Sequence, residues 1–467
     1  MAEIPDLIKL REIPADYAQR LDTDLLETST FQEATATQPG FARFDLQQKG
    51  FLHSQSKLFV SCTPSGADSF FPANVGIGSL IERAVLKAGN QVLNEISDWN
   101  HFQVMKSAQV DNEGQVDREL YLTGRCINHK FIFQEREDHR SEIDTHQAPY
   151  YGLDNGRDYS LDGALEGSDL LQLPFAKLET GRNAESPVFS IELSDLFPFL
   201  RVHSLPLYMI KEPLYIEIHW SPLSQRVLTA AGTAVQSVSI DTTELKFAAD
   251  YIFYTDAGVM DRYAEQNPLL EFTFPDYRMS KRSVNQAQLA SGVVANVGMA
   301  NRLVSRVLTT IQRSDVNASA MVGEYNMTAP EKLAGSTNQN SGALEYNVRY
   351  NDRFEFPISI DNKARAFTHL IQSEGPLFVT RQEYSNEQHG LTQFEYEGHD
   401  QDSVADGLAG KFFVVGTKLT SGRVGQRGIE VHFKCGAYGA HTFVMRTYSE
   451  YMRLARLEGG NFSVFNA

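Results

Sequence analysis

Residues 216–220 read IEIHW, and residues 429–433 read IEVHF. In each stretch the first, third and fifth residues are apolar, and the second and fourth are Glu and His. Alternation of this kind predicts a β-strand with one face in a core and the other face toward solvent. Two nearly identical strands in one chain predict that a β-rich domain occurs twice.

The surrounding sequence supports this duplication. LIERAV at 80–85 and LVSRVL at 303–308 each follow a segment that contains the tetrapeptide ANVG. Late in each half, an apolar strand runs into a tyrosine: KFAADYIFYTD at 246–256 and AHTFVMRTYSE at 440–450. We therefore expect each pair of segments to be equivalent, in two domains of roughly 200 residues each.

The pattern between these landmarks favours an all-β architecture. The predicted strands are short and are separated by Gly, Pro, Asn and Asp, which is typical of a sandwich or jelly roll and not of alternating strand–helix units. The better helical candidates are residues 16–33 and 362–374. Trp99 and Trp220 are predicted to be core residues.

Composition excludes several functional classes. The 467 residues include 59 acidic and 42 basic side chains, a formal net charge of −17, so we expect little direct nucleic-acid binding. No apolar run approaches the ~18 residues of a transmembrane segment. The proline-interrupted, acidic N-terminus does not resemble a signal peptide. Cys62, Cys126 and Cys435 lie far apart, which predicts reduced thiols and favours an intracellular origin.

The repeated Glu and His are the first candidates for chemistry. Glu217 and His219, like Glu430 and His432, have the spacing that places two side chains on one face of a strand, where they could bind a metal. The simpler interpretation is a solvated outer face. A metalloenzyme built from two cupin barrels needs two histidines separated by one residue, and no such pair occurs in the sequence. We predict no catalytic, cofactor-binding or metal-binding residues.

An acidic stretch at 135–169 is the second candidate. Its spacing does not fit the calcium loop of an EF-hand, so a hydrated loop is the simpler interpretation. The carboxylates that calcium could use are Asp154, Asp158, Asp162, Glu166 and Asp169. LEGGN at 457–461 resembles sites cut by adenovirus-type maturation proteases, although a small turn near the C-terminus is the simpler interpretation.

One longer stretch goes beyond a general β pattern. IELSDLFPFLRVHSLPLYMIKEPLYIEIHW, at 191–220, resembles the end of the first jelly roll in double jelly-roll major capsid proteins of polinton-like viruses and virophages. The wider lineage includes adenovirus hexons and the capsid proteins of large DNA viruses. Segments 244–266, 343–357 and 410–433 resemble further parts of these proteins in the same order.

This resemblance implies two tandem eight-stranded antiparallel jelly rolls with long loop insertions and a few short helices. The implied division is an N-terminal arm at 1–40, a first jelly roll at 41–264 with an acidic insertion at about 135–186, and a second jelly roll at 265–467 with insertions at about 325–345 and 383–410. The two similar pentapeptides would then be the same strand in successive jelly rolls.

The resemblance also implies a function. Such a chain is a major capsid protein without enzymatic activity or cofactor, located in the capsid shell of a double-stranded DNA virus and assembled inside the infected cell. Three copies form a pseudo-hexagonal capsomer, whose partners are neighbouring capsomers and penton and minor capsid proteins. The alternative is a two-domain jelly-roll protein that binds glycans or removes them, which would be a monomer with a deep polar cleft.

Overall fold

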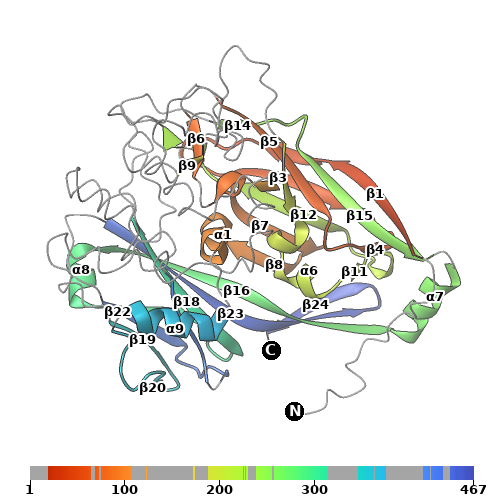
Figure 1. Cartoon of the computed structure of the whole chain (residues 1–467). Coiled ribbons are helices and arrows are strands. Elements are labelled where there is room, and N and C mark those ends of the chain that lie inside the picture. Colours follow the sequence, from red (N-terminus) through yellow and green to blue (C-terminus); the bar gives the residue numbers. More distant parts are fainter. Residues whose placement is uncertain are drawn as a thin grey trace.

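The structure is a computed structural model that contains two antiparallel β-sandwiches side by side (Figure 1). It describes residues 19–64, 69–72, 75–107, 122–123, 172–173, 188–223, 226, 228–229, 238–254, 257–313, 345–361, 363–374, 414–420, 422–434 and 442–466. The acidic stretch 135–169, Cys126 and Cys435 lie outside these residues, as do most of the insertions expected near 325–345 and 383–410.

The first sandwich packs a seven-stranded sheet on a five-stranded sheet. The larger sheet contains β1 (Gln19–Glu27), β4 (Phe51–Leu52), β5 (Lys57–Pro64), β10 (Val188–Glu192), β11 (Leu205–Pro206), β14 (Val238–Ile240) and β15 (Lys246–Tyr254). The smaller sheet contains β2 (Thr30–Gln32), β3 (Gly40–Leu46), β7 (Ile81–Ala88), β8 (Gln91–Ser97) and β12 (Leu214–Trp220). Short strands β6 (Ser69–Pro72), β9 (Gln172–Leu173) and β13 (Leu228–Thr229) pair separately.

The second sandwich is built in the same way. One sheet contains β16 (Leu269–Asn285), β18 (Val304–Arg313), β21 (Val415–Lys418), β23 (Thr442–Glu458) and β24 (Asn461–Asn466). The other contains β17 (Val293–Gly298), β19 (Glu345–Tyr350), β20 (Arg353–Phe354) and β22 (Ile429–Lys434).

Helices are short and lie between the strands. They are α1 (Trp99–Ser107), α5 (Leu193–Leu196), α6 (Pro198–Val202), α7 (Ala257–Gln266), α8 (Gln286–Ser291) and α9 (Lys363–Glu374), with 3₁₀ turns at Gly76–Leu80 and Leu207–Met209. Helix α7 connects the two sandwiches, and the expected domain boundary at 264/265 falls within it. No helix in the described part of the chain is long and apolar enough to cross a membrane.

The two halves share one strand order. When the eight principal strands of each half (β1, β3, β5, β7, β8, β10, β12 and β15, then β16 to β23) are counted along the chain, the first pairs with the eighth, the eighth with the third, and the third with the sixth. In the facing sheet, the second pairs with the seventh, the seventh with the fourth, and the fourth with the fifth. This is the pairing of a jelly roll, and it confirms the fold class expected from the sequence.

The repeated pentapeptides are the seventh strand of each jelly roll. In β12, Ile216 and Ile218 are buried, and Ile216 lies opposite Phe44 of β3 and Leu86 of β7. In β22, Val431 is buried between Ala295 of β17 and Val348 of β19. The same apolar face therefore fills the same place in both cores, and the predicted equivalence of the two strands is confirmed.

The predicted equivalence of LIERAV and LVSRVL is wrong. LIERAV gives β7, the fourth strand, which pairs with β12, whereas LVSRVL gives β18, the third strand, which pairs with β21 and β23 in the opposite sheet. By strand order the counterpart of β7 is β19. A short apolar motif around an arginine suits any half-buried strand, so its recurrence did not identify a position in the fold.

Of the two helical candidates, one is confirmed and one is wrong. Helix α9 occupies 363–374, as expected. Residues 19–27 form strand β1 instead of a helix, and all nine of them pair with β15. Leu26 packs on the core from this strand, so tertiary pairing overrides the helix propensity of its Leu, Gln and Arg residues. Residues 19–32, which the expected division assigned to the arm, thus contribute β1 and β2 to the first jelly roll.

Candidate functional site

The repeated Glu–His pairs occupy equivalent places on the outer faces of the two smaller sheets. The Nε2 atom of His219 lies 3.9 Å from Oε2 of Glu217, and Nε2 of His432 lies 3.8 Å from Oε2 of Glu430. The structure therefore brings together the two side chains of each pair.

The first pair is held by cations. Lys87 Nζ lies 2.6 Å from Oε2 of Glu217, and Arg83 Nη2 lies 2.8 Å from Nε2 of His219. Burial, together with the nearby Arg83 charge, lowers the pKa of His219 to about 4. The Nε2 lone pair of the neutral His219 ring accepts a hydrogen bond from the Arg83 guanidinium, so it is not available to a metal. We interpret this Glu–His pair as part of the packing on the sheet surface.

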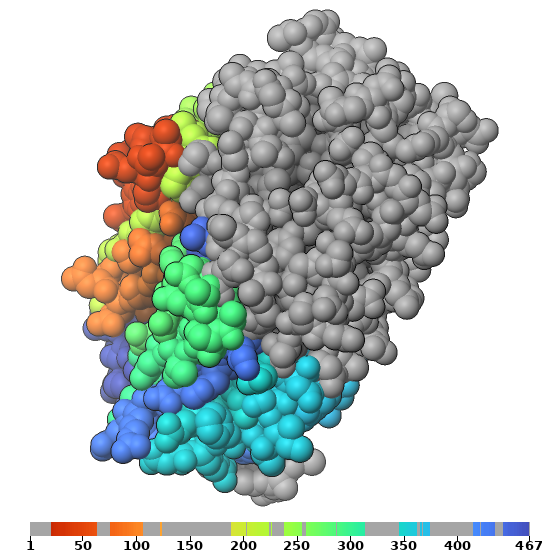
Figure 2. All heavy atoms as spheres, turned by 90° about the vertical axis from the view of Figure 1, so that its left-hand side faces the viewer, coloured from red at the N-terminus to blue at the C-terminus, as the bar shows by residue number. Residues whose placement is uncertain are grey.

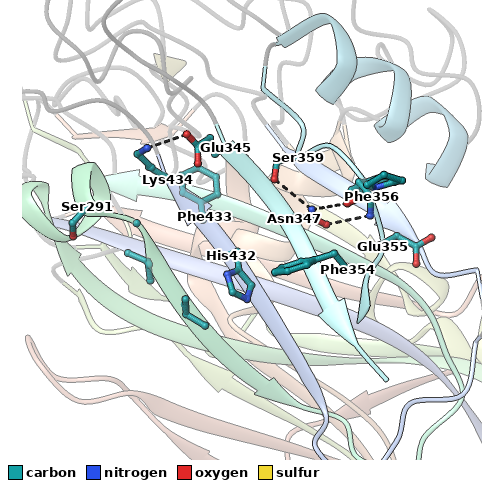
Figure 3. A pocket seen from close by; sticks show the side chains of 14 residues that line it. Ser291, Glu345, Asn347, Phe354, Glu355, Phe356, Ser359, His432, Phe433 and Lys434 are labelled. Atoms are coloured by element: carbon teal, nitrogen blue, oxygen red, sulfur yellow. Dashed lines mark hydrogen bonds and ion pairs between the residues drawn. The ribbon is translucent and has the colours of Figure 1, made fainter. Parts of the chain in front are cut away.

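His432 of the second pair borders a groove of about 660 Å³ on the outer face of the second jelly roll (Figure 3). The ring of Phe354 meets the His432 ring edge-on at 5.0 Å between centroids, and Arg349 Nη1 lies 3.4 Å from Oε2 of Glu430. At the other side of the groove, Lys434 Nζ lies 2.9 Å from Oε1 of Glu345. The carboxylates of Glu430 and Glu345 are thus paired with basic side chains, as on a solvated strand face.

The remaining sequence candidates give no further site. In the described residues, no group of three or more His, Cys, Asp and Glu side chains is placed to hold a metal ion. Cys62 is buried, and burial raises the pKa of its thiol to about 12, so it is a packed, protonated thiol. Trp99 and Trp220 are buried, as predicted. LEGGN forms the turn between β23 and β24, in which both glycines have positive φ.

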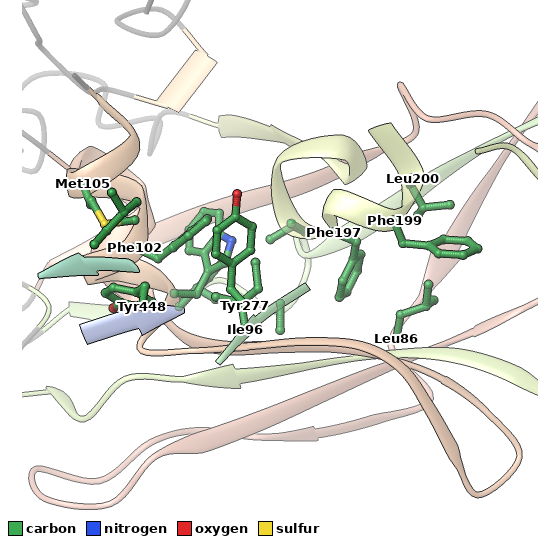
Figure 4. Packing of buried hydrophobic residues seen from close by; sticks show 14 of the residues in the cluster. Leu86, Ile96, Phe102, Met105, Phe197, Phe199, Leu200, Tyr277 and Tyr448 are labelled. Carbon is green, nitrogen blue, oxygen red and sulfur yellow. The ribbon is translucent and has the colours of Figure 1, made fainter. Parts of the chain in front are cut away.

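The most extensive constellation of buried aromatic and charged side chains joins the two jelly rolls. From the first jelly roll, Phe102 of α1 contacts Tyr277 and Tyr448 at 4.6 and 5.4 Å between ring centroids. Phe199 of α6 meets Phe274 of β16 edge-on at 4.7 Å. Figure 4 shows the rings of Phe102, Tyr277, Tyr448 and Phe199 along one layer of buried side chains.

A buried carboxylate lies beside this layer. Asp276 of β16 accepts from Asn94 Nδ2 of β8 at 2.7 Å, from Arg453 Nη1 at 2.8 Å and from the Tyr451 hydroxyl at 3.2 Å. Burial raises the pKa of Asp276, and the Arg453 charge opposes that rise. Arg453 also donates to the main-chain oxygen of Leu93 at 3.3 Å, so it ties the edge of β8 to the second jelly roll.

A second polar bridge lies at the start of α1. Arg446 Nε donates to Oδ2 of Asp98 at 2.9 Å, and the Tyr448 hydroxyl donates to the Asp98 main-chain oxygen at 3.0 Å. Lys281 Nζ lies 3.3 Å from the same carboxylate. Burial lowers the pKa of the adjacent His101 well below its usual value, with the Arg446 charge adding to the effect.

Sequence reasoning did not find this contact. The available signal was the presence of charged residues within two long apolar strands, namely Asp276 and Lys281 on β16 and Arg446 and Arg453 on β23. Such residues on a buried face indicate a polar contact with another layer.

The chain was compared with known proteins. No protein-family model matches it, and no curated protein matches its sequence. Solved structures match over nearly the whole length. The PBCV-1 virus capsid matches at 10% identity and a TM-score of 0.54, with 98% of this chain and 99% of that chain covered. The mavirus major capsid protein matches at 10% identity and a TM-score of 0.53, with 99% and 93% covered, and the Faustovirus major capsid protein at 9% identity and a TM-score of 0.50, with 96% and 92% covered. Likeness at this level of identity establishes the fold, and the chain has the double jelly-roll fold of viral major capsid proteins.

Proposed function

We propose that the chain is a major capsid protein, a structural subunit without catalytic activity, of which three copies form a pseudo-hexagonal capsomer of an icosahedral shell. The observation that carries the proposal is the presence of two complete jelly rolls with one strand order in a single chain. Three such chains present six similar units, which is what a hexagonal lattice position requires. The end-to-end likeness to capsid structures supports the same proposal.

The contact between the jelly rolls suits this role. Aromatic rings and buried ion pairs hold the two units in one orientation, and a subunit of a closed lattice needs a rigid shape more than it needs a cleft. The partners proposed are further copies of the chain, then neighbouring capsomers, and penton and minor capsid proteins, with the virion shell as its location.

Mass measurement tests the proposal directly. Light scattering during size-exclusion chromatography should give about 157 kDa (three times 52.3 kDa), and negative-stain images of that peak should show hexagonal outlines. A monodisperse species of 52.3 kDa would contradict it and would direct the search to glycan binding and hydrolysis, the alternative that the sequence left open.

The segment before β1 gives a second test. We propose that residues 1–18 contact a neighbouring capsomer or a minor capsid protein. Since β1 itself belongs to the first jelly roll, deletion of residues 1–18 should leave trimers intact and block shell assembly, whereas deletion of 1–30 should also lower stability because it removes the pairing of β1 with β15. Normal shells from the shorter deletion would show that the segment has no such role.

A further inference from the structure

The contact between the two jelly rolls of one chain uses two defined surfaces. On the first jelly roll it uses the edge strand β8, the fifth strand, whose Asn94 donates to Asp276. On the second it uses the paired first and eighth strands, β16 and β23. Asp276 meets β8, and the outer face that carries Arg446 and Tyr448 meets Asp98 and helix α1, which directly follow β8. An edge strand, together with the helix that directly follows it, therefore docks onto a two-strand ribbon.

The first jelly roll has the same ribbon, and within the described residues no edge strand docks onto it. Its first and eighth strands are β1 and β15, and Leu21 lies opposite Ile252, while Leu25 lies opposite Ala248. Leu26, on the opposite face of β1, packs on the core, so Leu21 and Leu25 belong to the outer face. Their residues are 58% and 62% exposed. We call this surface the β1–β15 face.

The second jelly roll has the same edge strand, and in the part of the chain that the structure describes no ribbon receives it. Its fifth strand, β20, lies at the edge of its sheet, as β8 does in the first jelly roll. Phe354 at the end of β20 is 47% exposed, and Ile358 shortly after it is 67% exposed. We call this surface the β20 edge. The β1–β15 face and the β20 edge therefore both carry large exposed apolar side chains. Their counterparts, β16–β23 and β8, are covered by the contact between the jelly rolls.

We propose that the β1–β15 face of one copy receives the β20 edge of a second copy, in the manner in which β16–β23 receives β8 within one chain. The occupant is a second copy because the chain itself carries both members of the matching pair. The two surfaces lie toward opposite ends of the molecule: β1 and β20 are far apart in Figure 1, and Figure 2 shows the first residues of the described chain (red) and residues 345–374 (cyan) at opposite ends of one face.

A contact between two different surfaces is heterologous, and it makes a ring when the rotation between copies closes. With one such contact inside each chain and one between chains, three chains give six similar contacts around the ring. The inference rests on the proposed capsomer and goes further by assigning its interface to named residues.

Crosslinking between thiols tests the assignment. The variant Leu25→Cys/Phe354→Cys is treated with a short bis-maleimide and analysed on denaturing gels, beside each single variant and the matched pair Leu25→Cys/Phe465→Cys. Phe465 is also a phenylalanine that is 47% exposed in the second jelly roll, but it lies on β24. Covalent trimer should form at least about tenfold more efficiently with residue 354 than with residue 465, since a docked pair has a millimolar effective concentration.

A disruptive variant gives an independent reading. Leu25→Asp places a charge in the proposed apolar contact, so the peak should shift from trimer to the 52.3 kDa monomer, while Val188→Asp, at a residue that is 49% exposed on β10, should leave the trimer intact. Circular dichroism checks that both variants are folded.

The two proposals fail in different ways. If the wild-type protein is a trimer, but the residue 354 pair crosslinks no better than the residue 465 pair and Leu25→Asp remains trimeric, the interface assignment is wrong and the capsomer proposal stands. If crosslinking requires an added minor capsid protein, the β1–β15 face binds that protein and not a second copy. A monomeric wild-type protein would overturn the capsomer and the interface together.

Discussion

Replacement of Arg453 by Met tests whether the Asp276 carboxylate, buried between the jelly rolls, needs the positive charge of Arg453 for the protein to keep its stability. The side chain of Asp276 is 3% exposed and that of Arg453 is 16% exposed, with 2.8 Å between Oδ2 and Nη1. Removal of one partner from a buried ion pair leaves the other charge without compensation, which costs about 3–5 kcal/mol of unfolding free energy. Asn94 and Tyr451 still donate to Asp276, so we expect the lower end of that range.

The matched control lies three residues further along β23. Arg456 donates to Oε1 of Glu271 at 2.9 and 2.6 Å, and the side chains of this pair are 39% and 21% exposed. A pair that water reaches contributes about 0–1 kcal/mol, so Arg456→Met should cost no more than that. Urea unfolding followed by fluorescence, at one fixed protein concentration, gives both values.

The cost of Arg453→Met should also depend on pH. Burial raises the pKa of Asp276 above its unfolded value, and loss of the Arg453 charge raises it further. A carboxyl group whose pKa is raised in the folded state favours folding at low pH, and this contribution is lost as pH rises through the folded pKa. The variant should therefore lose more stability at pH 7.5 than at pH 5. If Arg453→Met costs no more than Arg456→Met, or costs the same at both pH values, the interpretation of Asp276 as a buried charge is refuted.

Three further predictions concern other parts of the fold. Phe102→Ala removes the ring between Tyr277 and Tyr448 and should lower the free energy of unfolding in urea by about 3–5 kcal/mol. Phe465→Ala, at an exposed ring, should lower it by about 0.5 kcal/mol, and equal losses would show that α1 does not join the two jelly rolls. His219 should remain neutral in an NMR titration from pH 8 to pH 5.5, and a titration midpoint near 6.5 would contradict this. Between pH 6.5 and about 4 the unfolded chain takes up a proton at His219 that the folded ring does not, so His219→Gln should lose less stability than the wild type over that range. Gly428→Ala should lower the free energy of unfolding by more than about 2 kcal/mol, because φ is +75° and a Cβ would lie 2.3 Å from the Gly298 oxygen. Gly459→Ala, with φ of +61° and nothing within 4 Å, should lower it by about 1 kcal/mol. Similar melting temperatures for the two variants would refute the predicted clash.

Much of the fold was readable from the sequence where burial follows a simple period. The apolar residues of 216–220 and 429–433 alternate because one face of each strand fills a core, and both strands lie where the duplication predicts. Helix α9 was found for a similar reason, since Ala366 and Leu370, four residues apart, are both buried.

The errors arose where local pattern does not determine tertiary pairing. Residues 19–27 contain good helix formers, and only the distant strand β15 makes them a strand. LIERAV and LVSRVL look alike, yet they lie in opposite sheets of their jelly rolls. The contact between the jelly rolls was missed because its partners are far apart along the chain: Asn94 and Asp276 are separated by 182 residues, and Asp98 and Arg446 by 348.

The length of β23 has a consequence for biosynthesis. Residues 442–458 complete the second jelly roll through β16 and β18, and they also carry Arg446 and Arg453, which hold the first jelly roll in place. β16 emerges from the ribosome more than 150 positions before β23, the strand that pairs with it, and the surface of β8 that rests on β23 stays uncovered until residues 442–458 have been synthesised. Nascent chains arrested before residue 442 should therefore be protease-sensitive and prone to aggregate, and the native arrangement of both jelly rolls is acquired only after β23 has emerged from the ribosome.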